Sequence, residues 1–265
     1  MAFDVAAEAY DRYMGGYSRQ LSPQMADLAG VHAGQRVLDV GCGPGTITAD
    51  LAAIVAPGLV TGLDPAEAVL VQARQAAAER GLSTVDFVTG DVHALDAPDG
   101  SFDVVHAHQV LQHLADPVGA LTEMRRVTRS GGIVAVRDSD YAAFTWYPGD
   151  PVLDRWLEVY RSVARRNGAE PDAGRRLLSW AQRAGFTDIT ATASVWCFAN
   201  PEDRAWWTGM WSERIVASGI ADQAVEYGLS TRAELAEMAD AWRRLGSAPD
   251  GWFLVPHGEF LARVP

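Results

Sequence analysis

The stretch Val37–Thr46, VLDVGCGPGT, decides the fold of this 265-residue chain. Apolar residues lead into Gly41, Gly43 and Gly45, and the segment that follows, ITADLAAIVA, has helical spacing. A buried parallel strand reads as a nearly continuous apolar run, and glycines allow the chain to turn sharply at its end. The stretch therefore predicts a strand, a tight loop and the start of a helix, an arrangement that lets the backbone approach a ligand closely.

The spacing of the glycines indicates the kind of ligand. Dinucleotide-binding loops have the pattern GxGxxG and hold a pyrophosphate at the helix N-terminus. Here the pattern is GxGxG, and Asp39 stands two residues before the first glycine. A carboxylate at this point repels a pyrophosphate but suits a cofactor that carries positive charge. The loop therefore favours S-adenosylmethionine over a nicotinamide cofactor.

Composition excludes several classes of protein. The length suits one large α/β domain with an added element. A formal net charge of −12 disfavours nucleic acid as a main partner, because phosphate binding needs a basic face. Cys42 and Cys197 are the only cysteines, which is too few for a disulfide framework and typical of a reducing compartment. No signal peptide and no membrane-spanning apolar run are visible. We therefore expect a soluble, cytoplasmic protein without a membrane partner. The sequence leaves open whether the protein forms a homodimer.

Strand-like and helix-like segments alternate through the first half of the chain. The strand-like runs are 36–40, 59–64, 85–91, 102–108 and 131–139, and helical patterns cover about 46–56, 67–80 and 121–127. Such alternation predicts a doubly wound, mainly parallel sheet. We take 36–139 as the cofactor-binding core and 1–35 as an N-terminal helical segment.

The character of the sequence changes after residue 140. All nine tryptophans lie between Trp146 and Trp252. Amphipathic helical patterns occupy much of 140–170 and 200–247, and the alternating run 187–198 predicts a strand between them. A final strand over 251–264 is expected to be interrupted at Pro256–Gly258. Residues 140–265 thus combine the remaining core strands with an inserted helical cap.

Four motifs, in order, resemble those of class I S-adenosylmethionine-dependent methyltransferases. They are VLDVGCGPGT, GLDPAEAVL (62–70), GDVHAL (90–95) and SFDVVHAHQVLQHLADP (101–117). More narrowly, they are similar to the ubiquinone and menaquinone biosynthesis C-methyltransferases, over roughly residues 35–138. The resemblance implies a Rossmann-like sheet of seven strands with an antiparallel last strand, and an N-terminal segment that closes over the cofactor.

The resemblance also assigns cofactor roles. It places Asp39 and the three loop glycines near the methionine part, Asp64 with the adjacent Pro65 at the ribose, and Val69 against the adenine. The other implied cofactor residues are Asp91 and Val92 at the adenine edge, His108 and Gln109 near the sulfonium, and the N-terminal aromatic Tyr17. Taken alone, either Asp64 or Asp91 is also typical of a helix N-cap. Tyr17 also fits a helix packing face with Tyr10 and Tyr13.

Methyl transfer from a sulfonium is an in-line displacement, so the protein chiefly aligns and desolvates the nucleophile. A general base is needed only for a weakly acidic acceptor such as a hydroxyl. His113 is the candidate base, because it follows His108 at the cofactor end of the sheet and imidazole titrates near neutral pH. A capping or packing histidine is the alternative. The spacing of His106, His108 and His113 does not favour a metal site, and we expect no metal.

Candidate acceptor contacts come from other segments. Asp140 follows the fifth strand near Asp138, Trp207 and Trp211 belong to an aromatic cluster on one helix, and Tyr10 lies in the N-terminal segment. Solvated loop acids and core packing are the alternatives. No NPPY-like motif follows the fourth strand, which disfavours DNA-base and amide-nitrogen acceptors. The sequence predicts methyl transfer to O, C or N of a small aromatic or apolar metabolite. A nicotinamide-dependent oxidoreductase and a non-catalytic cofactor-binding protein are the alternatives.

Overall fold

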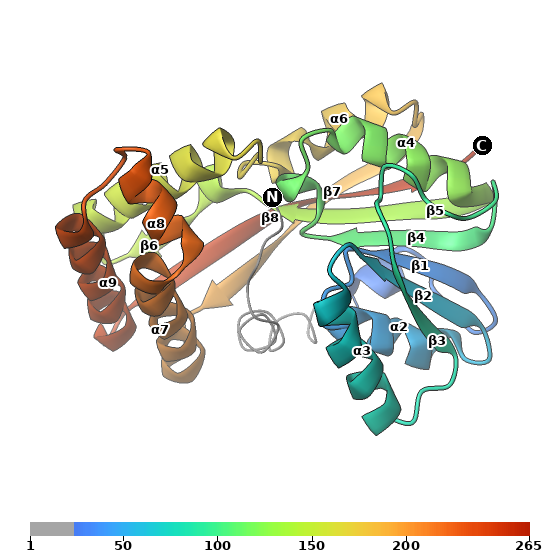
Figure 1. The fold of residues 1–265 in the computed structure, drawn as a ribbon, viewed down its shortest axis with the longest axis horizontal. Coiled ribbons are helices and arrows are strands. Elements are labelled where there is room, and N and C mark those ends of the chain that lie inside the picture. Colours follow the sequence, from blue (N-terminus) through green and yellow to red (C-terminus); the bar gives the residue numbers. More distant parts are fainter. Residues whose placement is uncertain (1–23) are drawn as a thin grey trace.

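The computed structural model describes residues 24–265, which form a mixed sheet with helices on both faces (Figure 1). The strand order is β3-β2-β1-β4-β5-β8-β6, and β7 also pairs with β8. The strands are β1 (Arg36–Val40), β2 (Leu59–Asp64), β3 (Val85–Thr89), β4 (Phe102–His108), β5 (Thr128–Ser139), β6 (Thr145–Tyr147), β7 (Asp188–Phe198) and β8 (Trp252–Arg263). Residues 1–23, which include the predicted site residues Tyr10 and Tyr17, lie outside the described part.

The predicted architecture is confirmed. Strands β1 to β5 pair in parallel, and the last strand, β8, is antiparallel to both β5 and β7. The described residues add an eighth strand, because the three-residue β6 pairs with the beginning of β8. This strand was not expected from the sequence.

The predicted interruption of the last strand is wrong, since β8 runs without a break through Pro256 and Gly258. The pair Pro256–Val195 belongs to a continuous register with β7. Gly258 is needed for a different reason. A Cβ atom there would lie 2.0 Å from the carbonyl oxygen of Gly174, which crosses over the strand. The glycine therefore permits a close approach of two backbones rather than ending the strand.

The helices begin where the sequence supplies capping side chains. The α-helices are α2 (Thr46–Val55), α3 (Glu67–Glu79), α4 (Pro117–Val127), α5 (Pro151–Arg166), α6 (Leu177–Arg183), α7 (Pro201–Ala217), α8 (Gly219–Glu226) and α9 (Arg232–Ser247). At the start of α4, Asp116 accepts a hydrogen bond from the backbone N–H of Gly119, and Asn200 caps α7 in the same way. Thr231 forms a capping box with Glu234 at the start of α9. Single 3-10 turns are η1 (Leu111–His113), η2 (Tyr141–Ala143) and η3 (Gly174–Arg176).

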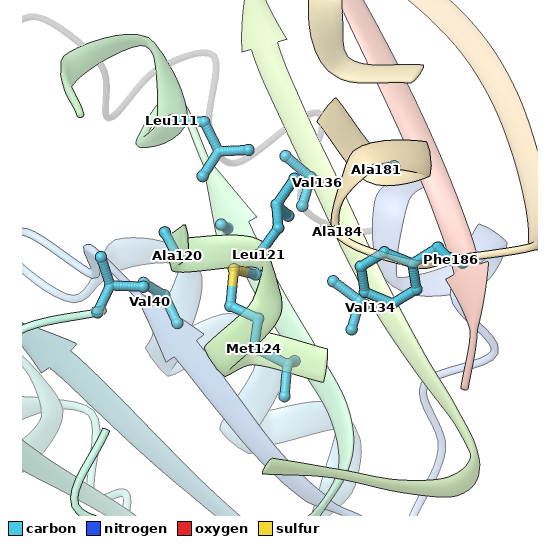
Figure 2. Close-up of a cluster of buried hydrophobic side chains, with 14 of the residues drawn as sticks. Val40, Leu111, Ala120, Leu121, Met124, Val134, Val136, Ala181, Ala184 and Phe186 are labelled. Atoms are coloured by element: carbon cyan, nitrogen blue, oxygen red, sulfur yellow. The ribbon is translucent and has the colours of Figure 1, made fainter. Parts of the chain in front are cut away.

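Helices α4 and α6 cover one face of the sheet. Figure 2 shows Leu121 and Met124 of α4 beside Val134 of β5, with Ala181 of α6 and the nearby Phe186 completing the cluster. All five side chains are buried. Helices α2 and α3 bury their apolar faces elsewhere, in separate clusters with β1, β2 and β3. This three-layer arrangement leaves the carboxyl ends of the parallel strands for a ligand site.

Helices α5, α7, α8 and α9 gather at the other end of the molecule (Figure 1). The buried apolar side chains of these helices form one hydrophobic cluster, which we call the cap cluster. Trp156, Trp211 and Trp242 lie at its centre, and each is less than 2% exposed. The Trp156 ring meets Trp211 and Trp242 edge-on, with ring centroids 4.6 and 4.7 Å apart. Burial of aromatic area and edge-to-face packing hold these helices together. Among residues 24–265, no helix is both long and apolar enough to cross a membrane.

Candidate active site

A cavity of about 320 Å³ lies between the carboxyl ends of the first, second and fourth strands and the helix α7. Its wall combines the glycine loop with aromatic residues from the cap cluster. Lining residues at the sheet end include Gly41, Gly43, Asp64, Gln109 and Val110, and those at the cap end include Tyr160, Trp207, Met210, Trp211 and Arg214. One cavity therefore joins the two regions that the sequence marks as cofactor-binding and acceptor-binding.

The glycine loop turns through a backbone conformation that L side chains rarely adopt. Gly41, Gly43 and Gly45 have φ angles of 65°, 53° and 81°. A Cβ atom on Gly41 would also lie 2.5 Å from a methyl carbon of Val110. The loop needs glycine for both reasons, and it leaves backbone exposed to the cavity at Gly41 and Gly43.

Asp64 closes the loop from the end of β2. One carboxylate oxygen accepts a hydrogen bond from the backbone N–H of Gly43 at 3.0 Å, and the other accepts from Ala66 at 2.9 Å. Each carboxylate oxygen has a further lone pair, so the group can accept from a ligand hydroxyl as well. The half-buried Asp64 lines the cavity.

Other predicted cofactor residues reach the same cavity. Pro65, Val69, Asp91 and Val92 all line it, on the side of β2 and β3. Asp91 accepts hydrogen bonds from the backbone and ring of His93, and these interactions hold the pKa of its carboxyl below the usual range. The carboxylate is thus ionised and exposed at one end of the cavity.

Asp39, predicted near the cofactor, instead lies behind the glycine loop and does not line the cavity. Its oxygens accept hydrogen bonds from the Thr48 hydroxyl at 2.6 Å and from the Nδ1 of His106 at 2.8 Å. Asp39 and His106 are paired positions on β1 and β4, so their side chains share one face of the sheet. Asp39 therefore ties the strand to α2 beneath the loop. Gly45 also lies off the cavity, where it packs against Ala73 and Phe87.

His108, predicted near the sulfonium, and Asp140, predicted as an acceptor contact, are likewise not among the described lining residues. His108 is buried between His106, Trp196 and His257. The Asp140 carboxylate is held by Arg175, with both N···O distances 2.7 Å. This bidentate guanidinium pair occupies both carboxylate oxygens, and the backbone N–H of Arg175 also donates to the carboxylate at 3.0 Å, which fixes the start of η3.

Trp207 and Trp211, predicted as acceptor contacts, do line the cavity. They are 4% and 1% exposed, so they also serve as core residues. Sequence reasoning missed their neighbours in the wall, which are Tyr141, Phe144, Tyr160, Trp196 and Arg214. The aromatic residues after the fifth strand were a usable signal, because strand ends in such sheets face the ligand site.

His113, the predicted base, lies in the cavity wall. Burial of its imidazole lowers the pKa to about 4, with the positive charge of Arg214 adding to the effect. The ring is therefore neutral near pH 7. A base with so low a pKa is poorly matched to removing a proton from a hydroxyl at neutral pH.

A chain of hydrogen bonds behind the wall sets the orientation of His113. The Ser139 hydroxyl donates to Oε1 of Gln112 at 2.6 Å, which leaves the Gln112 amide nitrogen facing Nε2 of His113 at 3.2 Å. Since an amide nitrogen only donates, Nε2 accepts and Nδ1 carries the ring hydrogen. The backbone N–H of Gln112 in turn donates to the buried Asp138, and burial raises the pKa of this carboxyl to about 8.

Other buried histidines sit behind the cavity. Burial lowers the pKa of His257 to about 3, with Arg137 adding to the effect, and lowers that of His108 well below its ordinary value. Nε2 of His257 accepts a hydrogen bond from the Gln109 side chain at 3.0 Å. Residues 24–265 contain no group of three His, Cys, Asp or Glu side chains arranged to hold a metal ion.

Because these histidines are buried in their neutral form, we expect the free energy of unfolding to decrease at acidic pH. His257 stays neutral when folded but takes up a proton below its ordinary pKa when unfolded, so the free energy of unfolding falls as the pH drops from about 6.5. One such group contributes a slope of about 1.4 kcal/mol per pH unit. Urea unfolding between pH 6.5 and 4.5 measures it. His257→Gln is expected to flatten the slope, whereas a variant of the exposed His32 should keep it. An unchanged slope in His257→Gln contradicts the prediction.

Comparisons with known proteins identify methyltransferases as relatives of this chain. The family model described as a methyltransferase domain matches residues 31–184. An uncharacterized methyltransferase of Schizosaccharomyces pombe is 36% identical over 239 residues, covering 85% of this chain and 83% of that protein. Aklanonic acid methyltransferase of Streptomyces sp. (strain C5) is 31% identical over 189 residues, covering 69% of this chain and 84% of its own.

A solved structure gives the same fold. Haemonchus contortus phosphoethanolamine N-methyltransferase 2, determined with S-adenosylhomocysteine, matches with a TM-score of 0.64 and 19% identity, covering all of this chain and 58% of that one. The family match spans more than half of the chain and coincides with the four motifs that resemble this family. The nicotinamide alternative has no support from these matches. The chain therefore belongs to the methyltransferase domain family and is a class I S-adenosylmethionine-dependent methyltransferase.

Proposed function

We propose that this methyltransferase acts on a small aromatic or apolar metabolite bound between the glycine loop and α7. The observation that carries the proposal is one continuous cavity that runs from Gly41 and Asp64 to the aromatic side chains of the cap cluster. Planar or apolar ligands suit such a wall, because aromatic side chains offer large contact areas at low conformational cost. The helices α5, α7, α8 and α9 thus serve as the cap over the acceptor.

The residues of the cavity fit S-adenosylmethionine. Gly41 and Gly43 present backbone without side chains to the cavity, Asp64 offers further lone pairs for ribose hydroxyls, and Val69 and Val92 provide an apolar surface for the adenine. When bound, the cofactor supplies an activated methyl group on a positively charged sulfur. Asp91 and Gln109 are the further residues that we propose as cofactor contacts.

The chain's own contribution to catalysis is positioning and the exclusion of water. Aromatic walls from η2, α5 and α7 desolvate the acceptor, which strengthens electrostatic interactions inside the cavity. We propose that His113 aligns the acceptor, since Gln112 fixes its ring and its pKa of about 4 makes it a weak base. This environment favours acceptors that enter already deprotonated or that need no base. The similarity to a methyltransferase named for aklanonic acid supports a small organic acceptor.

Two measurements test the proposal. Isothermal titration is expected to show binding of S-adenosylhomocysteine and none of NAD(H). Incubation with S-adenosylmethionine and a cytoplasmic metabolite extract is then expected to yield an apolar or aromatic product that has gained one methyl group. Boiled protein and protein without the cofactor are the controls. Methylation of nucleic acid or protein in place of any small molecule contradicts the proposal.

A further inference from the structure

We propose that His257 is a positioning residue for the methyl-transfer site. From β8 it holds the side chain of Gln109, so that the carboxamide oxygen faces the point in the cavity where the cofactor meets the acceptor. The inference rests on the proposed function, in which Gln109 contacts S-adenosylmethionine, and it adds the group that sets the orientation of that contact.

Gln109 leaves β4 in a conformation that needs support. Its φ angle is 56°, and it is the one residue other than glycine with a positive φ among residues 24–265. Glutamine rarely adopts this conformation, which persists only where the surrounding structure fixes it and is frequent at functional sites. The backbone N–H donates to the carbonyl oxygen of Arg137 at 2.7 Å, and the residue lines the cavity. This turn places one amide side chain in the cavity wall.

The strand order places Gln109 between the two ends of the cavity. Strand β1 lies between β2 and β4, so Asp64 and Gln109 flank the glycine loop on opposite sides. A Cβ atom on Gly41 would lie 2.5 Å from Val110, so the segment after β4 lies directly against the loop. The neighbouring strand β5 leads into η2, whose Tyr141 belongs to the aromatic wall. A cofactor held at Asp64 and an acceptor among the aromatic rings therefore meet beside Gln109.

His257 engages the amide nitrogen of Gln109. Nε2 of the imidazole accepts this hydrogen bond at 3.0 Å, and the histidine is 1% exposed. Burial and the charge of Arg137 lower the pKa of the ring to about 3, so the imidazole stays neutral and keeps its acceptor. An imidazolium has only donors and would release the amide. Glu259, two residues along β8, fixes the Arg137 guanidinium with an N···O distance of 2.7 Å.

His257 lies in a part of β8 that is fixed on both sides. The carbonyl oxygen of Pro256 accepts a hydrogen bond from the backbone N–H of Asp140 at 3.0 Å. On the other side, Gly258 allows the backbone of Gly174 to cross closely over the strand. The imidazole is therefore presented from a well-supported strand, which suits a residue that orients another side chain.

With its amide nitrogen on His257, Gln109 offers its carboxamide oxygen to the cavity. This oxygen accepts no hydrogen bond from any of residues 24–265. An amide oxygen carries partial negative charge, and low-dielectric walls strengthen its attraction for a positive group. The sulfur of the cofactor is positively charged before methyl transfer and neutral afterwards. The oriented oxygen should therefore favour S-adenosylmethionine over S-adenosylhomocysteine.

The affinities of these two compounds, measured by isothermal titration on the complete protein without acceptor, test this role. The compounds differ by one methyl group and by the charge on sulfur. His257→Leu is expected to weaken binding of S-adenosylmethionine about tenfold more than binding of S-adenosylhomocysteine, the lower end for an interaction with a charged group. His257→Gln keeps an acceptor for the amide, and its ratio of the two affinities should stay close to that of the unaltered protein.

A double-mutant cycle shows whether His257 acts through Gln109. Gln109→Leu alone should change the ratio of affinities at least as much as His257→Leu does. Adding His257→Leu to Gln109→Leu should then change the ratio no further, because coupled residues are not additive. Phe260→Leu is the matched control. Phe260 is fully buried on the same strand but faces the opposite side of the sheet, so its variant should lose stability and keep the ratio.

The ring nitrogen chemical shifts of His257 test the contact in the unaltered protein, even if His257→Leu fails to fold. Near neutral pH we expect a neutral ring with its hydrogen on Nδ1, and Gln109→Leu should shift the Nε2 resonance. A ring with its hydrogen on Nε2 overturns the inference, as does an unchanged ratio in His257→Leu or additivity in the cycle. These outcomes leave the proposed function intact. If the unaltered protein binds neither compound, the proposed function fails and this inference falls with it.

Discussion

An Asp64→Ala variant is expected to bind S-adenosylhomocysteine about 100-fold more weakly than the unaltered protein, because the two charge-assisted hydrogen bonds that we propose to the ribose hydroxyls would be lost. The same change frees the backbone N–H groups of Gly43 and Ala66, which the carboxylate now holds at 3.0 and 2.9 Å. The loop then loses both its ligand contact and its support. Isothermal titration measures the affinity.

Two further variants separate these contributions. Asp64→Asn keeps one amide oxygen for the backbone but removes the charge, so its loss of affinity should be intermediate. Asp86 is an exposed acid on the neighbouring strand β3 and does not line the cavity. Asp86→Ala should therefore bind S-adenosylhomocysteine normally. Normal affinity in Asp64→Ala, or an equal loss in Asp86→Ala, would remove Asp64 from the cofactor site.

The central strands of the sheet could be predicted from sequence because they are largely buried on both faces. The apolar runs at 36–40, 59–64 and 102–108 have the bounds of β1, β2 and β4. Buried parallel strands leave little room for polar residues, so their ends are sharply marked. The short edge strand β6 has no such pattern, and its pairing depends on β8, which lies far along the chain. The residue pattern of 145–147 therefore gives no sign of the pairing between β6 and β8.

The cofactor end of the cavity was also predictable, since its residues lie in short motifs at strand ends. Asp64 and Asp91 reach the cavity for this reason. The sequence does not show where a side chain finds a partner from a distant segment. His106 engages Asp39 and Arg175 engages Asp140, and both carboxylates are thereby kept from the cavity. Arg214 was missed because the cavity forms only when α7 packs beside η2 and α5.

A Trp211→Ala variant is expected to lose about 4 kcal/mol of the free energy of unfolding, as is typical when a buried aromatic side chain is truncated. Trp211 is 1% exposed, its ring meets Trp156 at 4.6 Å between centroids, and it stacks with Trp242 at 5.9 Å. Removing it leaves a hole at the centre of the cap cluster. Urea unfolding measures the loss.

Phenylalanine variants separate stability from ligand binding. Trp242 is fully buried in the same cluster but does not line the cavity, so it is the matched control for Trp211. Both Trp211→Phe and Trp242→Phe should lose about 1–3 kcal/mol of stability, less than the full truncation. Only Trp211→Phe changes the cavity wall and the ring on which Arg214 stacks. With S-adenosylhomocysteine bound, its affinity for a planar aromatic probe such as 2-naphthoate should fall up to about tenfold, the range of one aromatic contact. If both variants keep the affinity and lose only stability, Trp211 is a packing residue and the acceptor does not bind against the cap cluster.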